Sequence, residues 1–301
     1  MSSLDYRKQR INDISSQWLM DKRNNYFLEK QIKNIAFKKF KNSIKLYISK
    51  AMHIDFDEND AEFLINVDKA QNNLINITPN GAVVPKKEYC IEYNLFLKNW
   101  CEIIEDLIKP SIPLLKKFRV TPNIRIKFGT EIKDNVNREL NTTIPHSDSW
   151  VEGPFGLNMH VPIMGDCEFN YLCFYKLKNE NNFKDSFLET SESYNNMQWV
   201  LENYVEDNII PKQGYLNLSD YALLHKTKRN LNSGTRISID TTILVGNHPI
   251  HPDRNIEYLD SIPKIGENLF IFCERSEKKP VVDKKTTYSN YTTGSLKRIN
   301  L

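Results

Sequence analysis

The feature that most constrains the fold is a change in sequence character after Pro113. From residue 119 to about residue 275, short runs rich in β-branched and aromatic residues are separated by Gly, Pro, Asn and Asp. Helices do not alternate regularly with these runs, which disfavours a parallel α/β sheet. The pattern instead predicts an antiparallel barrel or jelly roll. The predicted strands are residues 123–128, 157–164, 169–175, 215–218, 222–225 and 236–245.

The residues before this β core are expected to be helical. Apolar residues recur at helical spacing over residues 27–48, and residues 88–108 predict another helix that ends before two prolines. The predicted parts are a helical N-terminal region at 1–118 packed on the core, a β core at 119–275 with a helical insert near 189–207, and a polar C-terminal tail at 276–301.

The composition excludes several classes of protein. Hydrophobic residues make up 40% of the chain and charged residues 26%, which is typical of a soluble globular domain and excludes intrinsic disorder. The net charge of +3, from 41 Lys+Arg and 38 Asp+Glu, is too small to indicate a nucleic-acid partner. No apolar run approaches the roughly 18 residues of a membrane span, and no secretory signal is visible. We therefore expect a cytoplasmic protein with no membrane partner.

The cysteines and the common catalytic motifs are also informative. The chain has five cysteines, an odd number, and no two of them form a CxxC motif. This argues against a disulfide framework and a zinc ribbon. Cys173 lies in an apolar run and is predicted to be buried. The absence of a P-loop, GxGxxG or GxSxG motif removes the commonest nucleotide-binding and hydrolase classes.

His146-Ser-Asp148 is the candidate metal-binding motif. In an extended chain, residues two apart point to the same side, so the imidazole and the carboxylate would converge on one point. His225 ends an apolar run and offers a second imidazole. Two histidines and one carboxylate with open coordination positions form the ligand set of non-haem Fe(II) oxygenases. A second such motif, His53-Ile-Asp55, lies in an acidic run of the helical region, and we interpret it as a chance match on a solvated loop.

Arg236 singles out His225 among the six histidines, because no other histidine has an Arg eleven positions after it. The intervening segment is rich in Asn, Ser and Gly, which predicts a turn between two strands. The return strand would place Arg236 on the wall behind the metal. Arg236 and Ser238, two residues apart, would together hold a carboxylate through the planar guanidinium and a hydroxyl.

Four segments together resemble the Fe(II)/2-oxoglutarate-dependent oxygenases. The resemblance is to the phytanoyl-CoA-dioxygenase-like branch, nearest to enzymes of streptomycin-type antibiotic pathways and bacterial carbohydrate-biosynthesis clusters. The segments are Pro145-His-Ser-Asp148-Ser-Trp150, Leu157-Asn-Met-His-Val-Pro162-Ile, Gly214-Tyr-Leu-Asn-Leu218 and His225…Asn230…Thr235-Arg-Ile-Ser238-Ile-Asp240. The match covers residues 120–245, and the N-terminal region adds nothing diagnostic.

The resemblance implies a double-stranded β-helix in which His146, Asp148 and His225 hold the iron. It also implies that Arg236, helped by Ser238, binds the distal carboxylate of 2-oxoglutarate. Asn158 is a further cofactor-binding candidate on the same predicted strand as His160, although it could equally stabilise a loop. Many relatives carry an aromatic residue where this chain has His160, so the pocket wall differs there.

The implied cofactors are Fe(II), 2-oxoglutarate as cosubstrate and O2, with release of succinate and CO2. The implied partner is a small molecule, a sugar or sugar-derived metabolite, with nucleotide-linked sugars included. Hydroxylation is the default reaction, and desaturation, epimerisation or ring formation would use the same ligands. One alternative is a cupin-type metalloenzyme that does not use 2-oxoglutarate, with Arg236 structural. The other is a non-catalytic small-molecule-binding barrel, which the complete set of ligands plus Arg236 disfavours.

Three further expectations concern residues around this site. Trp150 lines the substrate side or packs in the core. His248 and His251 lie between prolines and are interpreted as part of an ordinary loop. Substrate selectivity is expected to reside in the helical region up to residue 118 and in the insert near residues 176–213, because such a barrel is open at one end and needs a cover.

Overall fold

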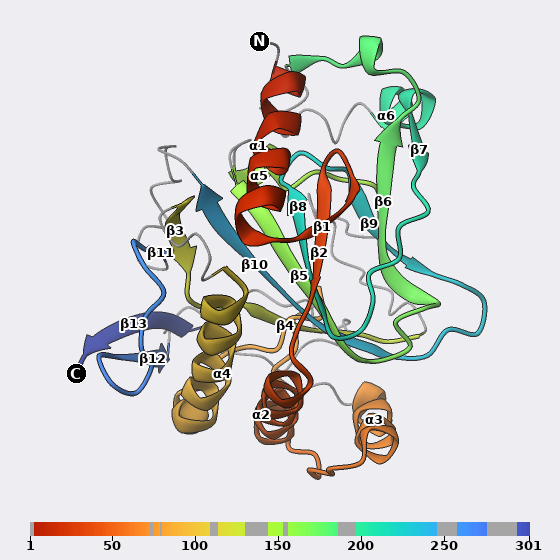
Figure 1. Cartoon of the computed structure of the whole chain (residues 1–301). Coiled ribbons are helices and arrows are strands. Elements are labelled where there is room, and N and C mark those ends of the chain that lie inside the picture. Colours follow the sequence, from red (N-terminus) through yellow and green to blue (C-terminus); the bar gives the residue numbers. More distant parts are fainter. Residues whose placement is uncertain are drawn as a thin grey trace.

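The chain forms a β core covered by helices, as the sequence predicts (Figure 1). The computed structural model describes residues 3–72, 75–78, 80–108, 114–129, 144–152, 156–185, 197–245, 258–275 and 294–301. The helices are α1 (Ser3–Trp18), α2 (Asn34–Met52), α3 (Asp60–Lys69), α4 (Cys90–Ile108), α5 (Ser149–Glu152) and α6 (Met197–Asn203). Short 3-10 turns are Ala70–Asn72, Lys87–Tyr89 and Glu180–Asn182. None of the helices described combines the length and apolar character needed to cross a bilayer.

Within the described ranges, the strands pair antiparallel in three sheets. They are β1 (Asp21–Asn24), β2 (Phe27–Gln31), β3 (Leu115–Arg119), β4 (Asn123–Lys127), β5 (Gly156–Gly165), β6 (Asn170–Leu177), β7 (Tyr204–Glu206), β8 (Tyr215–Asp220), β9 (His225–Arg229), β10 (Arg236–Val245), β11 (Tyr258–Leu259), β12 (Leu269–Arg275) and β13 (Gly294–Asn300). The main sheet has the order β1-β2-β8-β5-β10-β3-β11, with β4 also on β10. A minor sheet has the order β7-β6-β9, and β12 pairs with β13.

The main sheet separates an apolar layer from a polar one. On β10, Ile237 and Ile239 are fully buried against the helices, whereas Arg236, Ser238 and Asp240 line a cavity on the other face. The same alternation occurs on β4, where Ile124 and Ile126 join the core and Asn123, Arg125 and Lys127 line the cavity. Because successive strand residues point to opposite faces, one sheet supplies both the core and the polar wall.

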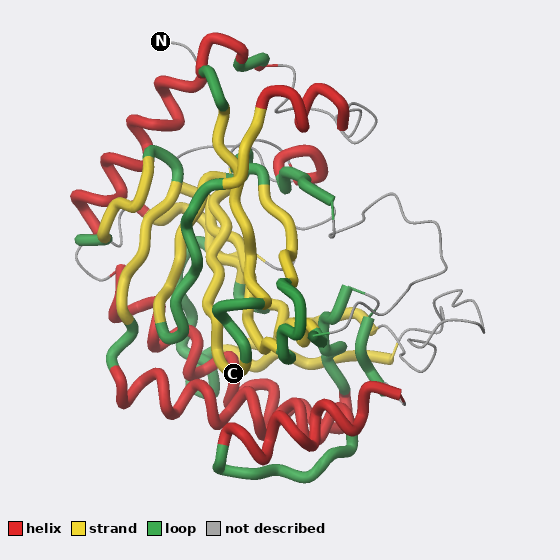
Figure 2. The backbone as a smooth tube through the Cα atoms, turned by 90° about the vertical axis from the view of Figure 1, so that its right-hand side faces the viewer, coloured by secondary structure: helices red, strands yellow, loops and turns green. Residues whose placement is uncertain are grey.

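The long helices pack on the apolar face of this sheet. In Figure 2 they run along one side and the lower end of the strands. A single hydrophobic core joins Trp18 of α1, Phe40 of α2 and Trp100 of α4 to the inward residues of β5, β8 and β10. The cavity lies on the opposite face, between the main sheet and Leu172 and Thr227 of the minor sheet. This is a mainly β core with a helical N-terminal region on its outer face.

One glycine is required where β5 meets β10. Gly165 lies opposite Arg236 and has a φ of 88°, in the left-handed region that favours glycine. A Cβ atom placed there would lie 2.1 Å from the carbonyl oxygen of Thr235. Only glycine permits this close approach, which sets the position of the strand that carries Arg236.

Several predicted elements need correction. The predicted helix over residues 27–48 is wrong at its start, because Phe27–Gln31 is strand β2, paired with β8, and the helix begins at Asn34. The predicted strand at residues 222–225 is also wrong: residues 222–224 belong to the turn and loop that precede the strand, which begins at His225. The pattern of apolar residues in a short run is compatible with helix and with strand. Whether a neighbouring strand is available to pair with the run therefore decides which of the two forms.

Other predicted elements are found or fall partly outside the described residues. Strands β4, β5, β6, β8 and β10 lie where the sequence predicts them. Helix α6 lies in the predicted insert, of which residues 186–196 are outside the described residues. In the predicted tail, β13 pairs with β12 and is largely exposed. The predicted boundaries at residues 118 and 275 stay predictions.

Candidate metal centre and its cavity

The two predicted histidine ligands lie directly opposite each other on paired backbone. The amide of His146 donates to the carbonyl of His225 at 3.0 Å, and the amide of His225 donates back at 2.9 Å. This exchange makes His146 and His225 an antiparallel pair at the edge of the minor sheet. Side chains of such a pair leave the same face, and the two imidazole centroids are 4.5 Å apart.

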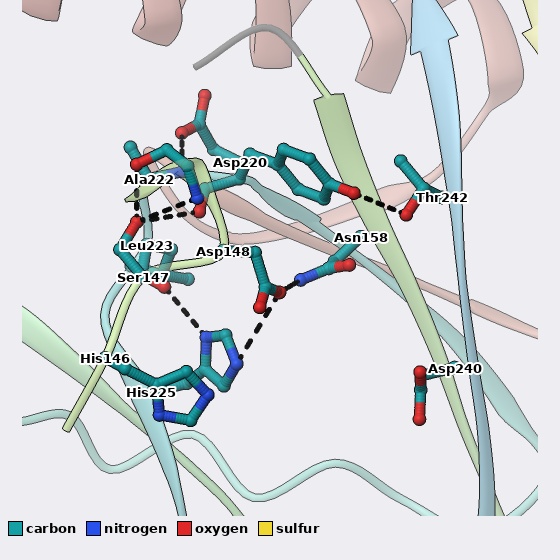
Figure 3. Close-up of polar contacts among 12 residues, drawn as sticks. His146, Ser147, Asp148, Asn158, Asp220, Ala222, Leu223, His225, Asp240 and Thr242 are labelled. Atoms are coloured by element: carbon teal, nitrogen blue, oxygen red, sulfur yellow. Dashed lines mark hydrogen bonds and ion pairs between the residues drawn. The ribbon is translucent and has the colours of Figure 1, made fainter. Parts of the chain in front are cut away.

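Asp148 completes the cluster from two residues further along the chain. One ligand atom each from His146, Asp148 and His225 lies within 4.8 Å of the others. Nε2 of His225 is 3.6 Å from Oδ2 of Asp148. Figure 3 shows the carboxylate beside the two rings. The intervening Ser147 points away and donates to the carbonyl of Tyr221 at 3.0 Å, so the alternation expected of an extended segment is present.

The orientation of each imidazole is set by a backbone carbonyl. Nδ1 of His146 is 2.9 Å from the carbonyl oxygen of Ile144, and Nδ1 of His225 is 3.0 Å from that of Leu223. A carbonyl only accepts, so each Nδ1 carries the proton and each Nε2 is the nitrogen whose lone pair can bind a metal. Such outer partners orient histidine ligands in metal sites. Burial and the neighbouring His225 lower the pKa of His146 to about 4, which keeps its imidazole neutral, as a ligand must be.

Asn158 lies beside the acidic ligand rather than beside Arg236. Its Nδ2 donates to Oδ2 of Asp148 (Figure 3). Asn158 also lines the cavity, from the strand that carries His160. The contact restrains the carboxylate, which is a role that sequence reasoning did not assign to Asn158.

The cluster opens into a cavity of about 400 Å³. His146, Asp148 and His225 line one part of it, and Arg236 and Ser238 line another. Arg236 is only 2% exposed, and its Nε and Nη1 atoms have no hydrogen-bond partner among the described residues. Burial lowers the pKa of Arg236 to about 10, and the guanidinium still remains charged at neutral pH. A buried cation whose donors are unpaired among the described residues is costly, so the cavity favours an anionic ligand.

The cavity wall near Arg236 carries further charge. Nε of Arg125 lies 2.6 Å from Oδ2 of Asp240, and Nδ2 of Asn123 donates to Oδ1 at 2.8 Å. Burial opposes ionisation of Asp240, but Arg125 and Asn123 outweigh it and lower the pKa of Asp240 to about 2. Burial and the nearby guanidinium groups lower the pKa of Lys127 well below its usual value. The oxygens of Asp240 are therefore already engaged by Arg125 and Asn123.

Similar folds occur among known structures. The SnoK carbocyclase of nogalamycin biosynthesis, a non-haem α-ketoglutarate-dependent enzyme, is 7% identical over 84% of this chain and 87% of its own, with a TM-score of 0.47. The SnoN epimerase, also α-ketoglutarate-dependent, is 9% identical over 81% and 86%, with a TM-score of 0.43. AviO1 from Streptomyces viridochromogenes Tue57 is 12% identical over 84% and 100%, with a TM-score of 0.44. No family model and no curated protein matches the sequence.

The other predicted residues are placed as follows. His53 ends α2 with a φ of 57° and is exposed, as is Asp55, in keeping with a chance match on a solvated segment. Trp150 is buried in a small core with Tyr171 and Tyr204. Of its two predicted roles, the structure therefore shows packing in the core and not lining of the cavity. Cys173 is buried, and all five cysteines are free. His248 and His251 lie outside the described residues.

The sequence reasoning missed part of the cavity wall. Lys127, Arg125 and Asn123 alternate with isoleucines, a period-two signal that would have identified them as one polar face. The prediction that selectivity resides in the helical region and in the insert stays a prediction. Among the described cavity residues, Asn80 alone comes from the helical region, and none comes from residues 176–213.

Proposed function

We propose that this protein is an Fe(II)/2-oxoglutarate-dependent oxygenase. One observation carries the proposal: a cluster of two histidines and a carboxylate opens into the same cavity as a buried arginine whose Nε and Nη1 donors have no partner among the described residues. Two imidazoles and one carboxylate suit Fe(II) and leave coordination positions open. The unpaired guanidinium suits a dicarboxylic cosubstrate, because its planar fork pairs with a carboxylate in two hydrogen bonds.

In this proposal, the side chains that line the cavity hold and orient the metal and the cosubstrate. His146, Asp148 and His225 hold the metal through Nε2 and carboxylate oxygens, with the rings set by Ile144 and Leu223. Arg236 and Ser238 hold the distal carboxylate of 2-oxoglutarate, and Asn158 steadies Asp148. When bound, Fe(II) and 2-oxoglutarate supply the activation of O2, with succinate and CO2 as products.

The decisive experiment is an anaerobic titration of the purified protein with Fe(II) and then with 2-oxoglutarate. We expect a weak visible charge-transfer band that appears only when both are present. A cupin-type metalloenzyme that does not use 2-oxoglutarate would bind Fe(II) without this band. A non-catalytic barrel would release no succinate in air. The absence of the band would refute the proposal.

For the substrate, we propose a sugar or sugar-derived metabolite, with nucleotide-linked sugars included. Amide and hydroxyl side chains line the cavity, among them Asn80, Asn123, Thr241 and Thr242, and such groups suit a ligand rich in hydroxyls. The test is substrate-triggered succinate release across a panel of nucleotide sugars and glycosides. Release triggered only by an apolar substrate would overturn this part. A cytoplasmic location stays a prediction.

A further inference from the structure

His160 is a buried polar side chain that the proposed mechanism does not use. It lies on β5, directly opposite Asp240 of β10, and lines the cavity. Its residue is 6% exposed, and neither Nδ1 nor Nε2 has a hydrogen-bond partner among the described residues. A neutral imidazole has one donor and one acceptor, and leaving both unpaired in a buried site is costly. The side chain is therefore placed for a ligand.

The metal is not that ligand in the arrangement described. The cluster of potential metal ligands among the described residues consists of His146, Asp148 and His225, and His160 is outside it. Asp240 accepts from Arg125 and Asn123, and among the described residues it makes no hydrogen bond with His160. Among the described residues, the ring nitrogens of His160 are thus left for a group that enters the cavity.

Arg236 shows which part of the cavity that partner occupies. Its Nε and Nη1 atoms are also buried without a hydrogen-bond partner in the part of the chain that the structure describes, and Arg236 faces the same cavity from β10. Ser238 lies between Arg236 and Asp240 on the cavity face, so His160 is diagonal to Ser238 across the strand pair. Burial and the guanidinium of Arg236 together lower the pKa of His160 to about 3, so the imidazole is a neutral donor.

We propose that His160 donates a hydrogen bond to the distal carboxylate of 2-oxoglutarate, alongside Arg236. The inference rests on the proposed function. It adds a hydrogen-bond donor from β5 to the carboxylate site that Arg236 forms on β10. A carboxylate has lone pairs enough for the guanidinium, the imidazole N–H and the Ser238 hydroxyl together. One ligand group then satisfies the unpaired donors of two buried side chains.

The test compares two ligands of the Fe(II)-loaded protein under anaerobic conditions. The ligands are 2-oxoglutarate and 2-oxopentanoate, which keeps the 2-oxo acid but lacks the distal carboxylate. Affinities are measured by calorimetry for the wild type and for His160→Phe, His160→Gln and the exposed control His53→Phe. We expect His160→Phe to weaken 2-oxoglutarate binding about tenfold, as for a lost hydrogen bond to a charged group. His160→Gln, which keeps a donor, should lose less.

The second ligand separates this role from a structural one. Binding of 2-oxopentanoate should be the same in the wild type and both His160 variants, and Fe(II) affinity should not change. Equal losses for the two ligands, a loss of Fe(II) binding, or undiminished 2-oxoglutarate binding in His160→Phe would each overturn the assignment. If the wild type itself fails to bind 2-oxoglutarate, the proposed function fails instead, and the two failures are distinguishable.

Discussion

At the scale of single residues, backbone hydrogen bonds set the geometry of the ligand cluster. His146 and His225 exchange two backbone hydrogen bonds, and each ring is then oriented by a carbonyl two residues before it. The hydrogen bonds that orient the two rings come from backbone carbonyl groups and not from flexible side chains. The cluster is therefore formed before metal arrives, which reduces the entropy lost on binding.

The first prediction concerns the three ligands. Replacing His146, Asp148 or His225 by Ala should abolish Fe(II) binding, because the two remaining ligands hold the ion poorly. The loss should exceed the roughly 10- to 100-fold typical of a lost outer partner of a ligand. The measurement is equilibrium dialysis of iron, with His53→Ala as the matched control. If His53→Ala loses as much iron as His146→Ala, the wrong motif has been assigned.

The second prediction concerns Arg236. Arg236→Ala removes the charged partner of a desolvated carboxylate, at a cost of about 2–5 kcal/mol. The affinity for 2-oxoglutarate should fall at least about tenfold, while Fe(II) affinity stays the same. Titration of the charge-transfer band measures the affinity for 2-oxoglutarate, and equilibrium dialysis of iron measures the affinity for Fe(II). Unchanged affinity for 2-oxoglutarate would show that Arg236 is structural, as in the cupin-type alternative.

The third prediction is a pH dependence that comes from His160. Its pKa is about 3 in the folded protein and about 6.5 in the unfolded chain, so only the unfolded chain gains this proton as the pH falls between those values. Acid therefore favours unfolding, by up to about 1.4 kcal/mol per pH unit. Urea unfolding of the metal-free protein from pH 6 to 4 should show a steeper loss of stability in the wild type than in His160→Phe. Parallel profiles would contradict the prediction.

At the scale of elements, a buried ion cluster ties α1 to the strand that precedes the metal site. Arg7 and Arg10 of α1 lie 2.7 and 2.8 Å from the carboxylate of Asp220, at the end of β8. Oδ1 of Asp220 also accepts from the amide of Ala222 at 2.9 Å, in the turn that leads to His225. Burial opposes ionisation, yet the two guanidinium groups keep the pKa of Asp220 below its ordinary value.

The fourth prediction concerns this cluster. Asp220→Asn removes the negative charge that pairs with the two buried guanidinium groups, and the free energy of unfolding should fall by about 3–5 kcal/mol. Denaturant unfolding measures it. The control is Glu102→Gln, which breaks the exposed Lys98–Glu102 pair on α4 and should cost less than about 1 kcal/mol. Equal effects of the two substitutions would show that α1 is not held through Asp220.

At the scale of the whole molecule, the candidate site joins the two sheets. His146 and His225 belong to the edge of the minor sheet, whereas Arg236 and Ser238 belong to the main sheet. Ligands that bridge these groups bind the folded state and not the unfolded chain. Such ligands stabilise the fold in proportion to the logarithm of their concentration.

The fifth prediction follows from that linkage. Fe(II) should raise the unfolding temperature under anaerobic conditions, and 2-oxoglutarate should raise it further. At a hundred times its Kd, 2-oxoglutarate should add about 2.7 kcal/mol to the free energy of unfolding. Calorimetry measures both steps. In Arg236→Ala the first step should remain and the second should shrink. A second step of undiminished size would place 2-oxoglutarate elsewhere.

The sequence by itself determined the local features of this protein. Alternation over residues 236–245 and the spacing of His146 and Asp148 follow from the two-residue period of extended chain, which needs no distant partner. The core strands and the residues of the candidate cluster could therefore be predicted. The tertiary structure alone decided the pairing of His146 with His225, the engagement of Asn158 by Asp148 and the strand at Phe27–Gln31. These depend on segments far apart in the chain, whose contacts arise from the packing of the whole molecule and not from local sequence period.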